Sequence, residues 1–315
     1  MPNQDSTTTA LAVGDKWADE VLARRNLARQ SRAAALAAHP QRLELAMKIS
    51  VAAAPVAEAA LQTAGFLVAA GDSWFDYPLH DVLKLLEDEH GYSTESAAHR
   101  GDPMESIAFQ DGQRDKLSRC VDKVKAHGVI PKAVLLSGGG DDIAGKEFGM
   151  LLNNAMSPNA GWNDEIVEGV LNQRILIAYK FMIAFINSLC QKDLGQILPI
   201  LVHGYDYPVP DGRGFLGGWP FPGPWLEPGF NEKLFSNLAK NAGLMHDIIE
   251  RFNQMLSKLA QDPAFVNVHY VDLRNTLSTD LNNDAYQDWW ANELHPTKKG
   301  FQAVTNKFAD ALKTL

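Results

Sequence analysis

A serine and a distant histidine have the sequence contexts best suited to chemistry in this chain. Residues 66–73 read Phe-Leu-Val-Ala-Ala-Gly-Asp-Ser, an apolar run that stops at a small-residue turn ending in Ser73. The run predicts a buried strand, and open α/β sheets place their chemistry at the carboxyl ends of their strands. A serine hydroxyl is a poor nucleophile until a base takes its proton. His295, in a late His-Pro pair, is the candidate base because imidazole titrates near neutral pH.

Each of these two residues also has a plainer interpretation. The hydroxyl of Ser73 could cap the turn that follows it, and His295 could be a packed surface histidine. His203, which ends another predicted strand, is the main rival base.

Four short motifs, in order along the chain, resemble those of the SGNH, or GDSL-type, hydrolase superfamily. They are Gly71-Asp72-Ser73, Gly101 in Ala-His-Arg-Gly-Asp, Gly139-Gly140-Asp141-Asp142 and His295-Pro296. Together they span residues 66–300, about three quarters of the chain. The resemblance implies an α/β protein, a three-layer α/β/α sandwich on a five-stranded parallel sheet (the flavodoxin-like SGNH hydrolase fold).

The resemblance also implies a division of labour. Ser73 would attack an acyl carbonyl, and His295 would take the proton as general base and return it to the leaving alcohol. The backbone N–H groups of Ser73 and Gly101 would donate to the oxyanion of the tetrahedral intermediate. Glycine suits that position because it lets the backbone approach closely. No metal or organic cofactor is expected.

Asp141 departs from the family's pattern in the oxyanion hole. The family has an asparagine there, whose side-chain amide is the third oxyanion donor. An ionised carboxylate only accepts hydrogen bonds, so it would repel the forming oxyanion. Asp141 could still donate if it were protonated, which burial beside Asp142 would favour by raising its pKa.

Asn292 departs from the pattern in the group that orients the histidine. It stands three residues before His295, where the family commonly has an aspartate. An amide oxygen can accept from the imidazole N–H, but it supplies no charge to stabilise an imidazolium. Asp288, Glu293 or a backbone carbonyl are the alternatives for this role.

Apolar runs alternate with segments of helical periodicity along most of the chain. Strands are predicted over residues 67–70, 92–97, 133–137, 197–203 and 266–271. Helices are predicted over residues 79–89, 103–127, 172–190, 230–259 and 297–312. Strands separated by helices indicate a parallel sheet covered on both faces. Two more helices are predicted within residues 13–64, with a break at His39-Pro40. We therefore expect an N-terminal helical extension at 1–64 and a hydrolase domain at 65–315.

Residues 205–230, which we call the aromatic loop, interrupt this alternation. They contain seven aromatic residues, six prolines and six glycines in 26 positions. A loop of this length in a compact domain is usually functional or disordered, and disordered segments are poor in aromatics. A wall or lid of the substrate site and a structural flap both fit. The predicted substrate-binding residues are Trp74, Tyr205, Trp219 and Trp225.

The composition of the chain restricts which partners and which cellular compartment are expected. The formal net charge of −9, without a basic run, argues against nucleic acid or an anionic membrane as the main partner. Cys120 and Cys190 fit free thiols in a reducing compartment. The N-terminus lacks a secretion signal, and polar residues and a proline interrupt the apolar stretch at residues 49–71. We expect no integral membrane segment and a cytoplasmic location, with leaderless export as the alternative.

These observations together predict a serine esterase or lipase that acts on a small-molecule or lipid-like ester through acyl-Ser73. One alternative is a polysaccharide O-acetylesterase, because aromatic platforms also stack sugars. The other is a non-catalytic binding or scaffold protein that kept the fold and lost the oxyanion hole at Asp141. The oligomeric state is left open.

Overall fold

The computed structural model describes residues 3–37, 63–145 and 147–315, and a five-stranded parallel sheet lies at its centre. The strands are β1 (Phe66–Ala70), β2 (Ser93–Ser96), β3 (Ala133–Leu136), β6 (Ile200–His203) and β7 (Val268–Val271). All neighbouring pairs are parallel, in the order β2-β1-β3-β6-β7. Strands β1, β3 and β6 are buried along their whole length, which explains their continuous apolar sequences.

The strand order creates a topological switch point between β1 and β3. After β1 the chain moves outward to β2 and then returns to the other side of β1 to form β3. The segments that leave the carboxyl ends of β1 and β3 therefore diverge, and ligands bind in the crevice that opens at such a point. Ser73 follows β1 and Asp141 follows β3, so the topology carries both residues to this crevice.

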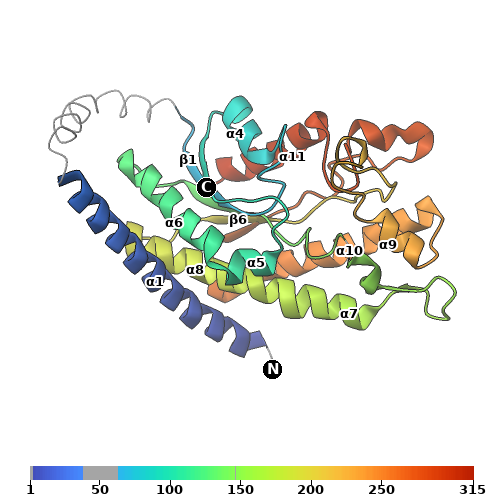
Figure 1. The fold of residues 1–315 in the computed structure, drawn as a ribbon, viewed down its shortest axis with the longest axis horizontal. Coiled ribbons are helices and arrows are strands. Elements are labelled where there is room, and N and C mark those ends of the chain that lie inside the picture. Colours follow the sequence, from blue (N-terminus) through green and yellow to red (C-terminus); the bar gives the residue numbers. More distant parts are fainter. Residues whose placement is uncertain (1–2, 38–62, 146) are drawn as a thin grey trace.

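Helices cover both faces of the sheet and complete the predicted three-layer α/β/α sandwich (Figure 1). The covering helices are α4 (Val82–His90) and α11 (Lys298–Lys313) on one face, and α5 (Met104–Phe109), α6 (Asp111–Ala126), α8 (Leu176–Leu194) and α10 (Leu238–Leu259) on the other. Each helix turns an apolar stripe to the sheet. In α11 that stripe includes Phe301, Val304 and Phe308, all fully buried.

Several helix boundaries differ from the predicted ranges. The extended backbone of Gln110 divides the predicted helix over 103–127 into α5 and α6. The helix over 230–259 is likewise divided into α9 (Glu227–Glu232) and α10. The helix over 172–190 is longer, because α7 (Asp164–Glu168) and a π-helical stretch (Gly169–Ile175) lead directly into α8. The smaller elements are the antiparallel pair β4 (Leu152–Asn153) and β5 (Gly161–Trp162), and 3₁₀ turns at Phe148–Leu151, Phe215–Gly217, Pro263–Phe265 and Asn282–Asp288.

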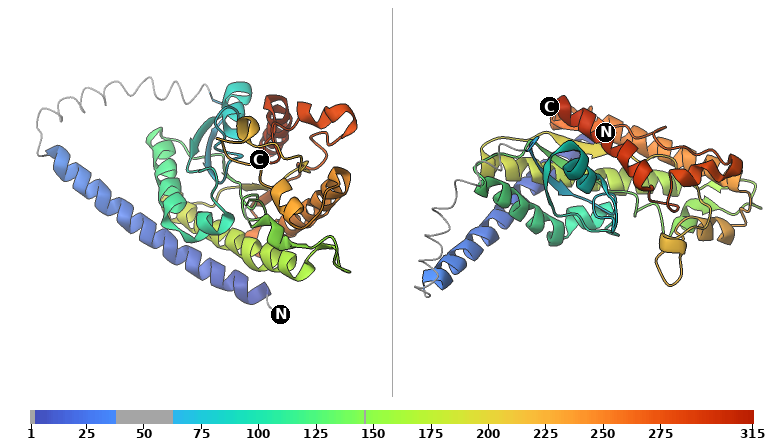
Figure 2. Two further views of the ribbon diagram at one scale, coloured as in Figure 1. Left: turned by 45° about the vertical axis from the view of Figure 1, so that its right-hand side comes forward. Right: turned by 90° about the horizontal axis from the view of Figure 1, so that it is seen from above.

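The N-terminal extension begins with one long helix, α1 (Asn3–Ala37), which lies along α8 outside the three layers (Figure 2). Gly14 allows close packing, because a Cβ there would come within 2.6 Å of the backbone of Ala184. The Arg25 guanidinium bonds to the carboxylate of Asp193 at 2.7 Å. The predicted break at His39-Pro40 and the second predicted helix lie outside the described residues.

One helix in the described ranges is long and apolar enough to cross a membrane by length and composition alone. It covers residues 164–194, and 56% of its most apolar stretch is buried inside the protein. It packs against α1, α5 and α10, as a core helix does. The stretch considered in the sequence, residues 49–71, lies partly outside the described residues.

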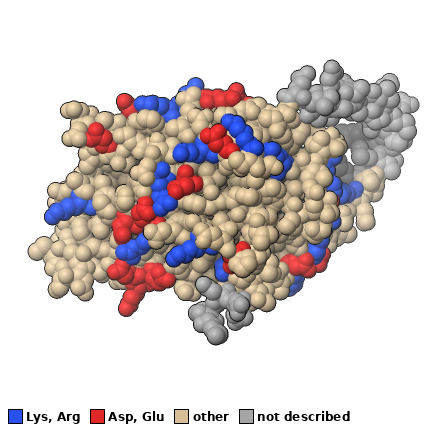
Figure 3. Space-filling model, turned by 180° about the vertical axis from the view of Figure 1, so that it is seen from behind, with Lys and Arg blue, Asp and Glu red and all other residues tan. Residues whose placement is uncertain are grey.

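Surface charges of both signs are interspersed. Figure 3 shows the face opposite that of Figure 1, where Lys and Arg alternate with Asp and Glu and no large area of one sign stands out among the described residues. Many surface charges of the described residues form ion pairs, such as Arg251 with Asp164 and Lys123 with Glu95. This face has no electrostatic footprint of the kind that binds a nucleic-acid backbone.

Candidate active site

The structure brings Ser73 and His295 into direct contact. The Nε2 atom of His295 lies 2.8 Å from Oγ of Ser73, although the two residues are 222 positions apart. Ser73 lies in the turn after β1. His295 lies in residues 290–296, which we call the histidine segment, whose ends Trp290 and Pro296 pair as an isolated antiparallel bridge before α11. Both residues are thus fixed by short connections to rigid elements.

Asn292 orients the imidazole of His295. Its Oδ1 atom accepts from the backbone N–H groups of Leu294 (3.0 Å) and His295 (2.9 Å). The same oxygen lies 3.1 Å from Nδ1 of His295. Because an amide oxygen can only accept, Nδ1 carries the proton and Nε2 is left to accept from Ser73. This is the tautomer that a general base requires.

Tyr77 is a site residue that the sequence reasoning missed. Its hydroxyl accepts from Nδ2 of Asn292 at 3.0 Å, which fixes the orientation of the amide. Its ring stacks on the imidazole of His295, with centroids 4.2 Å apart and planes inclined by 21°. The only signal in the sequence was its position four residues after Ser73, within the turn that leaves β1.

Burial keeps the base in its neutral form. His295 is 6% exposed, and burial lowers the pKa of its imidazole to about 3. Asn292 offers no negative charge to oppose this shift, in contrast to an aspartate at that position. His295 can therefore accept a proton at any pH well above that value.

Two backbone N–H groups beside Ser73 are open to a ligand. The N–H groups of Ser73 and Gly101 donate to no protein acceptor in the described part of the chain. Gly101 has φ +83°, and a Cβ there would meet nothing within 4 Å. Both residues line the same cleft as His295. Two free donors facing a nucleophile form an arrangement that can bind an oxyanion.

Asp141 lines the same cleft as Ser73, Gly101 and His295, but its carboxyl group has no hydrogen-bond or ion-pair partner among the described residues. Burial, together with the charges of Asp72, Asp142 and Asp102, raises the pKa of Asp141 to about 8. Asp142 turns away from Ser73, and its Oδ2 accepts from the backbone N–H of Met104 at 2.7 Å.

His203 and Tyr205 belong to a buried hydrogen-bond network next to the turn that carries Ser73. The sequence suggests other roles for them, as rival base and as substrate-binding residue. His203, the rival base, is fully buried and its Nε2 lies 2.8 Å from Oγ of Ser137. Ser137 in turn donates to Asp72 at 2.7 Å. The hydroxyl of Tyr205 also donates to Asp72 and accepts from the N–H of Gly140. His203 and Tyr205 therefore support the turn that carries the serine, and the two ring nitrogens of His203 bond to Gly204 and Ser137.

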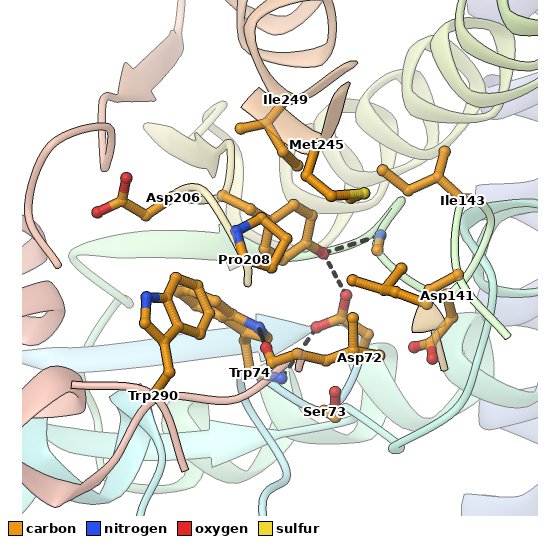
Figure 4. Close-up of a pocket in the computed structure, with 15 residues that line it drawn as sticks. Asp72, Ser73, Trp74, Asp141, Ile143, Asp206, Pro208, Met245, Ile249 and Trp290 are labelled. Carbon is orange, nitrogen blue, oxygen red and sulfur yellow. Dashed lines mark hydrogen bonds between the residues drawn. The ribbon is translucent and has the colours of Figure 1, made fainter. Parts of the chain in front are cut away.

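A narrow apolar pocket opens on one side of Ser73 (Figure 4). Its volume is about 40 Å³. Ser73 and Asp141 lie at one end, and the apolar walls are formed by Trp74, Ile143, Leu226, Met245, Ile249 and Trp290. Trp74, one of the residues predicted to bind substrate, is part of this wall, and its indole N–H donates to the carbonyl of Leu294 at 3.2 Å. Tyr205 also borders the pocket with its ring.

A wider cleft of about 460 Å³ also borders Ser73. Its catalytic end is formed by Ser73, Gly101, Asp141 and His295, and its walls by Tyr77, Arg100, Phe215, Phe221 and Trp225. Three of these wall residues come from the aromatic loop. Trp225 contacts His295 edge-on, with ring centroids 5.7 Å apart. The aromatic loop is thus one wall of the cleft.

Trp219, also predicted to bind substrate, lies apart from both cavities. Its side chain is 95% exposed and lines neither the narrow pocket nor the wide cleft. The physical reason is local, because short backbone bonds from Phe215 N to Pro222 O and from Phe221 N to Gly218 O close the loop tip on itself. The tip projects from the body (Figure 2) and carries Trp219 into solvent.

Glu293 and Asp288, the alternative acids for His295, have other positions. The fully buried carboxylate of Glu293 accepts from the backbone N–H groups of Gly212 (3.0 Å), Trp225 (2.5 Å), Leu226 (2.8 Å) and Glu227 (2.9 Å). It therefore fastens the aromatic loop to the histidine segment. Asp288 is exposed, and its backbone carbonyl accepts from the hydroxyl of Thr297. Neither carboxylate bonds to the imidazole.

No family model and no curated protein matches the chain. The similar solved structures include a protein from Parabacteroides merdae described as a GDSL-like lipase, with 12% identity and a TM-score of 0.46 over 81% of this chain and 98% of that chain. A catalytic mutant of an acetylxylan esterase from Geobacillus stearothermophilus matches with 12% identity and a TM-score of 0.41, over 79% of this chain and 94% of that one. A Desulfitobacterium hafniense protein described as lipolytic and of the G-D-S-L family has 14% identity and a TM-score of 0.41, over 78% and 98%. Two of the three descriptions name the family that the four motifs resemble.

Proposed function

We propose that this chain is a serine esterase that hydrolyses carboxylic esters through an acyl-Ser73 intermediate. The observation that carries the proposal is the 2.8 Å contact between Oγ of Ser73 and Nε2 of His295. It lies where the narrow pocket and the wide cleft meet, beside the free N–H groups of Ser73 and Gly101. A nucleophile, a base and an oxyanion site within reach of one another are the parts that acyl transfer requires.

In the first half of the reaction, Oγ of Ser73 attacks the ester carbonyl while Nε2 of His295 accepts the hydroxyl proton. The carbonyl oxygen becomes an oxyanion and accepts hydrogen bonds from the N–H groups of Ser73 and Gly101. The bond to the alkoxide then breaks, and the alkoxide takes the proton from His295. Water next attacks acyl-Ser73 with His295 again as base, which releases the acid and restores the serine.

Two contacts of His295 take the part of the aspartate that the resembled family has at the position of Asn292. Asn292 holds the imidazole by accepting from Nδ1, so Nε2 stays directed at Ser73. The ring face of Tyr77, stacked on His295, attracts the imidazolium that forms transiently, because an aromatic face carries negative charge density. The cation is still less stabilised than beside an aspartate, so we expect modest turnover.

The wide cleft favours an apolar acyl group. Phe215, Phe221 and Trp225 present aromatic rings along it, and its volume of about 460 Å³ accommodates a chain of several carbon atoms. Such a lining stabilises an acyl chain by removing its apolar surface from water.

A carbohydrate O-acetylesterase is the second candidate, and the narrow pocket favours it. About 40 Å³ beside Ser73 admits the methyl group of an acetyl ester but no long chain. The sugar would then lie in the wide cleft and stack on rings such as that of Trp225. Both candidates use the same nucleophile and base, and they differ in which compartment receives the acyl group.

A fluorophosphonate probe tests the proposed function. The full chain should acquire one phosphonyl group on the peptide that contains Ser73, and the Ser73→Ala variant should acquire none. A panel of p-nitrophenyl esters from acetyl to palmitoyl, with acetylated sugars, then separates the two candidates. Folded wild-type protein that remains unlabelled and hydrolyses no ester would instead support a binding or scaffold protein.

A further inference from the structure

Asp141 is a carboxyl group at the proposed reaction centre that the fold leaves without any partner. It borders both the narrow pocket and the wide cleft, as Ser73 does. Its position after β3 faces the turn after β1 across the switch point of the sheet. Of the described N–H and O–H groups, none donates to its oxygens. Asp141 is half-buried, so an ionised carboxylate here would be partly desolvated and would receive no hydrogen bond from the described residues, which is costly.

The charged groups around Asp141 make ionisation still less favourable. Asp72 from the end of β1, its neighbour Asp142 and Asp102 from the turn before α5 all act to raise its pKa. Burial itself is the largest cause. Like charges at short range disfavour a further negative charge, so a proton is the simplest way to neutralise the site.

The nearby cations are engaged with other acids. Arg100 lines the wide cleft, but it is exposed and its Nε lies 3.7 Å from Oδ2 of Asp76. Arg174 pairs with Glu105 beside Asp142. The other ionisable groups that line the two cavities are His295, which burial keeps neutral, and Tyr77 and Tyr205, whose pKa values burial raises. Asp206 also borders the narrow pocket, but its carboxyl oxygens accept from the backbone N–H groups of residues 275–277. The described residues include no group of three or more His, Cys, Asp or Glu that could hold a metal ion.

We propose that Asp141 is a neutral carboxylic acid and donates its O–H to the oxyanion, as the third donor of the hole formed by Ser73 and Gly101. This inference rests on the proposed esterase function. The proton stays on Asp141 throughout, so the donor stabilises the intermediate without exchanging a proton with it. A carboxylic acid thereby takes the part that a neutral amide plays in the resembled family.

The proposal makes activity depend on the protonation of Asp141. Below its pKa of about 8 the O–H is present and the oxyanion hole has three donors. As the pH rises through that value, the donor is lost and a negative charge faces the oxyanion. The reaction rate should therefore fall on the alkaline side, by about 10²-fold for the loss of one such donor. His295 titrates at much lower pH, so its ionisation does not contribute to this loss of activity at alkaline pH, which we call the alkaline limb.

The test is the pH dependence of kcat/KM for a short p-nitrophenyl ester, measured for the wild type and for Asp141→Asn. The wild type should lose activity above about pH 8, whereas the asparagine variant, whose amide donates at every pH, should stay flat across that range. Asp141→Ala, which has no donor, should be about 10²-fold slower near pH 6 and also flat. An alkaline limb that is the same in wild type and Asp141→Asn would overturn the proposal. So would Asp141→Ala with wild-type activity near pH 6.

Asp142→Asn supplies a second, independent test, because it should shift the alkaline limb in a known direction. Its amide oxygen can still accept from the N–H of Met104, so the turn is preserved. Removal of the neighbouring charge should lower the pKa of Asp141 and move the alkaline limb to lower pH. A limb that moves to higher pH, or does not move, would contradict the assignment.

Labelling of Ser73 keeps this inference separate from the proposed function. If no variant and no wild-type sample reacts with the fluorophosphonate near pH 6, the esterase proposal itself fails. If wild type and Asp141→Asn both label Ser73 near pH 6 but show the same alkaline limb, only the role of Asp141 fails. Measurements with and without a chelator should coincide, because the O–H donor involves no metal ion.

Discussion

The two sides of Ser73 are built in opposite ways. On one side the histidine segment leaves few polar groups open, since Asn292 bonds to His295 and Tyr77 and Glu293 accepts four backbone N–H groups. On the other side, residues 138–142, which we call the aspartate turn, leave the carboxyl of Asp141 and Oδ1 of Asp142 without partners among the described residues. Buried polar groups are normally bonded, so the unpaired Oδ1 of Asp142 is unusual, and the half-buried carboxyl of Asp141 is open to both the narrow pocket and the wide cleft.

The contrast assigns different tasks to the two segments: the histidine segment positions the base, and the aspartate turn sets the charge next to the nucleophile. Apart from the unpaired Nε1 of Trp290, the histidine segment forms a hydrogen-bonded network that fixes geometry, and its members act through the orientation of His295 and the placement of the aromatic loop. An unbonded carboxyl next to a nucleophile is available to a substrate and responds to pH. Variants of the histidine segment should therefore change geometry and stability, whereas variants of the aspartate turn should change the pH dependence.

The largest effect is expected for His295→Ala. Loss of the base should lower kcat/KM by on the order of 10⁶-fold, about as much as Ser73→Ala, because the members of a catalytic unit are not additive. The double variant should be no slower than either single variant. Steady-state hydrolysis of p-nitrophenyl acetate measures all three. A double variant that is much slower than both would show that serine and histidine do not act together.

Asn292→Ala should have an intermediate effect, about 10²-fold, because the imidazole loses the acceptor that selects its tautomer. Asn292→Asp is the informative comparison. A carboxylate beside Nδ1 should raise the pKa of His295 and move the acidic limb of the pH–rate profile to higher pH. If Asn292→Ala cost as much as His295→Ala, the amide would have a role beyond orientation.

Glu293→Gln should act mainly on stability. Each carboxylate oxygen accepts from two N–H groups, and in the variant an amide NH2 would face one of these pairs and leave it without an acceptor. We therefore expect a loss of about 2 kcal/mol or more in the free energy of unfolding. The aromatic loop should loosen, which raises KM for esters that occupy the wide cleft. Urea unfolding and kinetics on the same samples check both effects, with the exposed Asp288→Asn as the matched control. Unchanged stability would show that the fastening of the loop is not energetically important.

The smallest effect is a pH-dependent gain of stability in Asp141→Asn. The raised pKa of Asp141 means that the native state holds a proton that the unfolded chain has released above its ordinary pKa near 4. This group's contribution to stability is therefore fully present below about pH 4 and is lost progressively as the pH rises toward 8. Asp141→Asn removes that loss, so its melting temperature should exceed that of the wild type by a few degrees at pH 8 and match it near pH 4. A gain that is largest at low pH would have the wrong sign.

The sequence predicts well what depends on local pattern. The apolar runs of β1, β3 and β6 indicate buried strands, and strands in that order with helices between them indicate the parallel sheet. Ser73 then follows a strand end, and the histidine motif stands directly before the last helix. Helix ends are less accurate, because they depend on single extended residues such as Gln110.

The sequence does not show contacts between segments that are far apart. Tyr77 meets Asn292 across 215 positions, and Glu293 reaches the aromatic loop across 66 to 81 positions. Aromatic composition alone also does not tell a wall residue from an exposed one. Trp225 lines the cleft and Trp219 lies in solvent, only six residues apart, because the fold of the loop tip decides between them.

Trapping of the acyl-enzyme is the most direct test of the central claim. Wild-type protein mixed with a large excess of p-nitrophenyl acetate and quenched in acid should carry one acetyl group on the peptide that contains Ser73. The His295→Ala variant, folded and treated in the same way, should carry none. An acetyl group on another residue, or hydrolysis of the ester by wild-type protein in which acetylation of Ser73 can be excluded, would contradict an acyl-Ser73 mechanism.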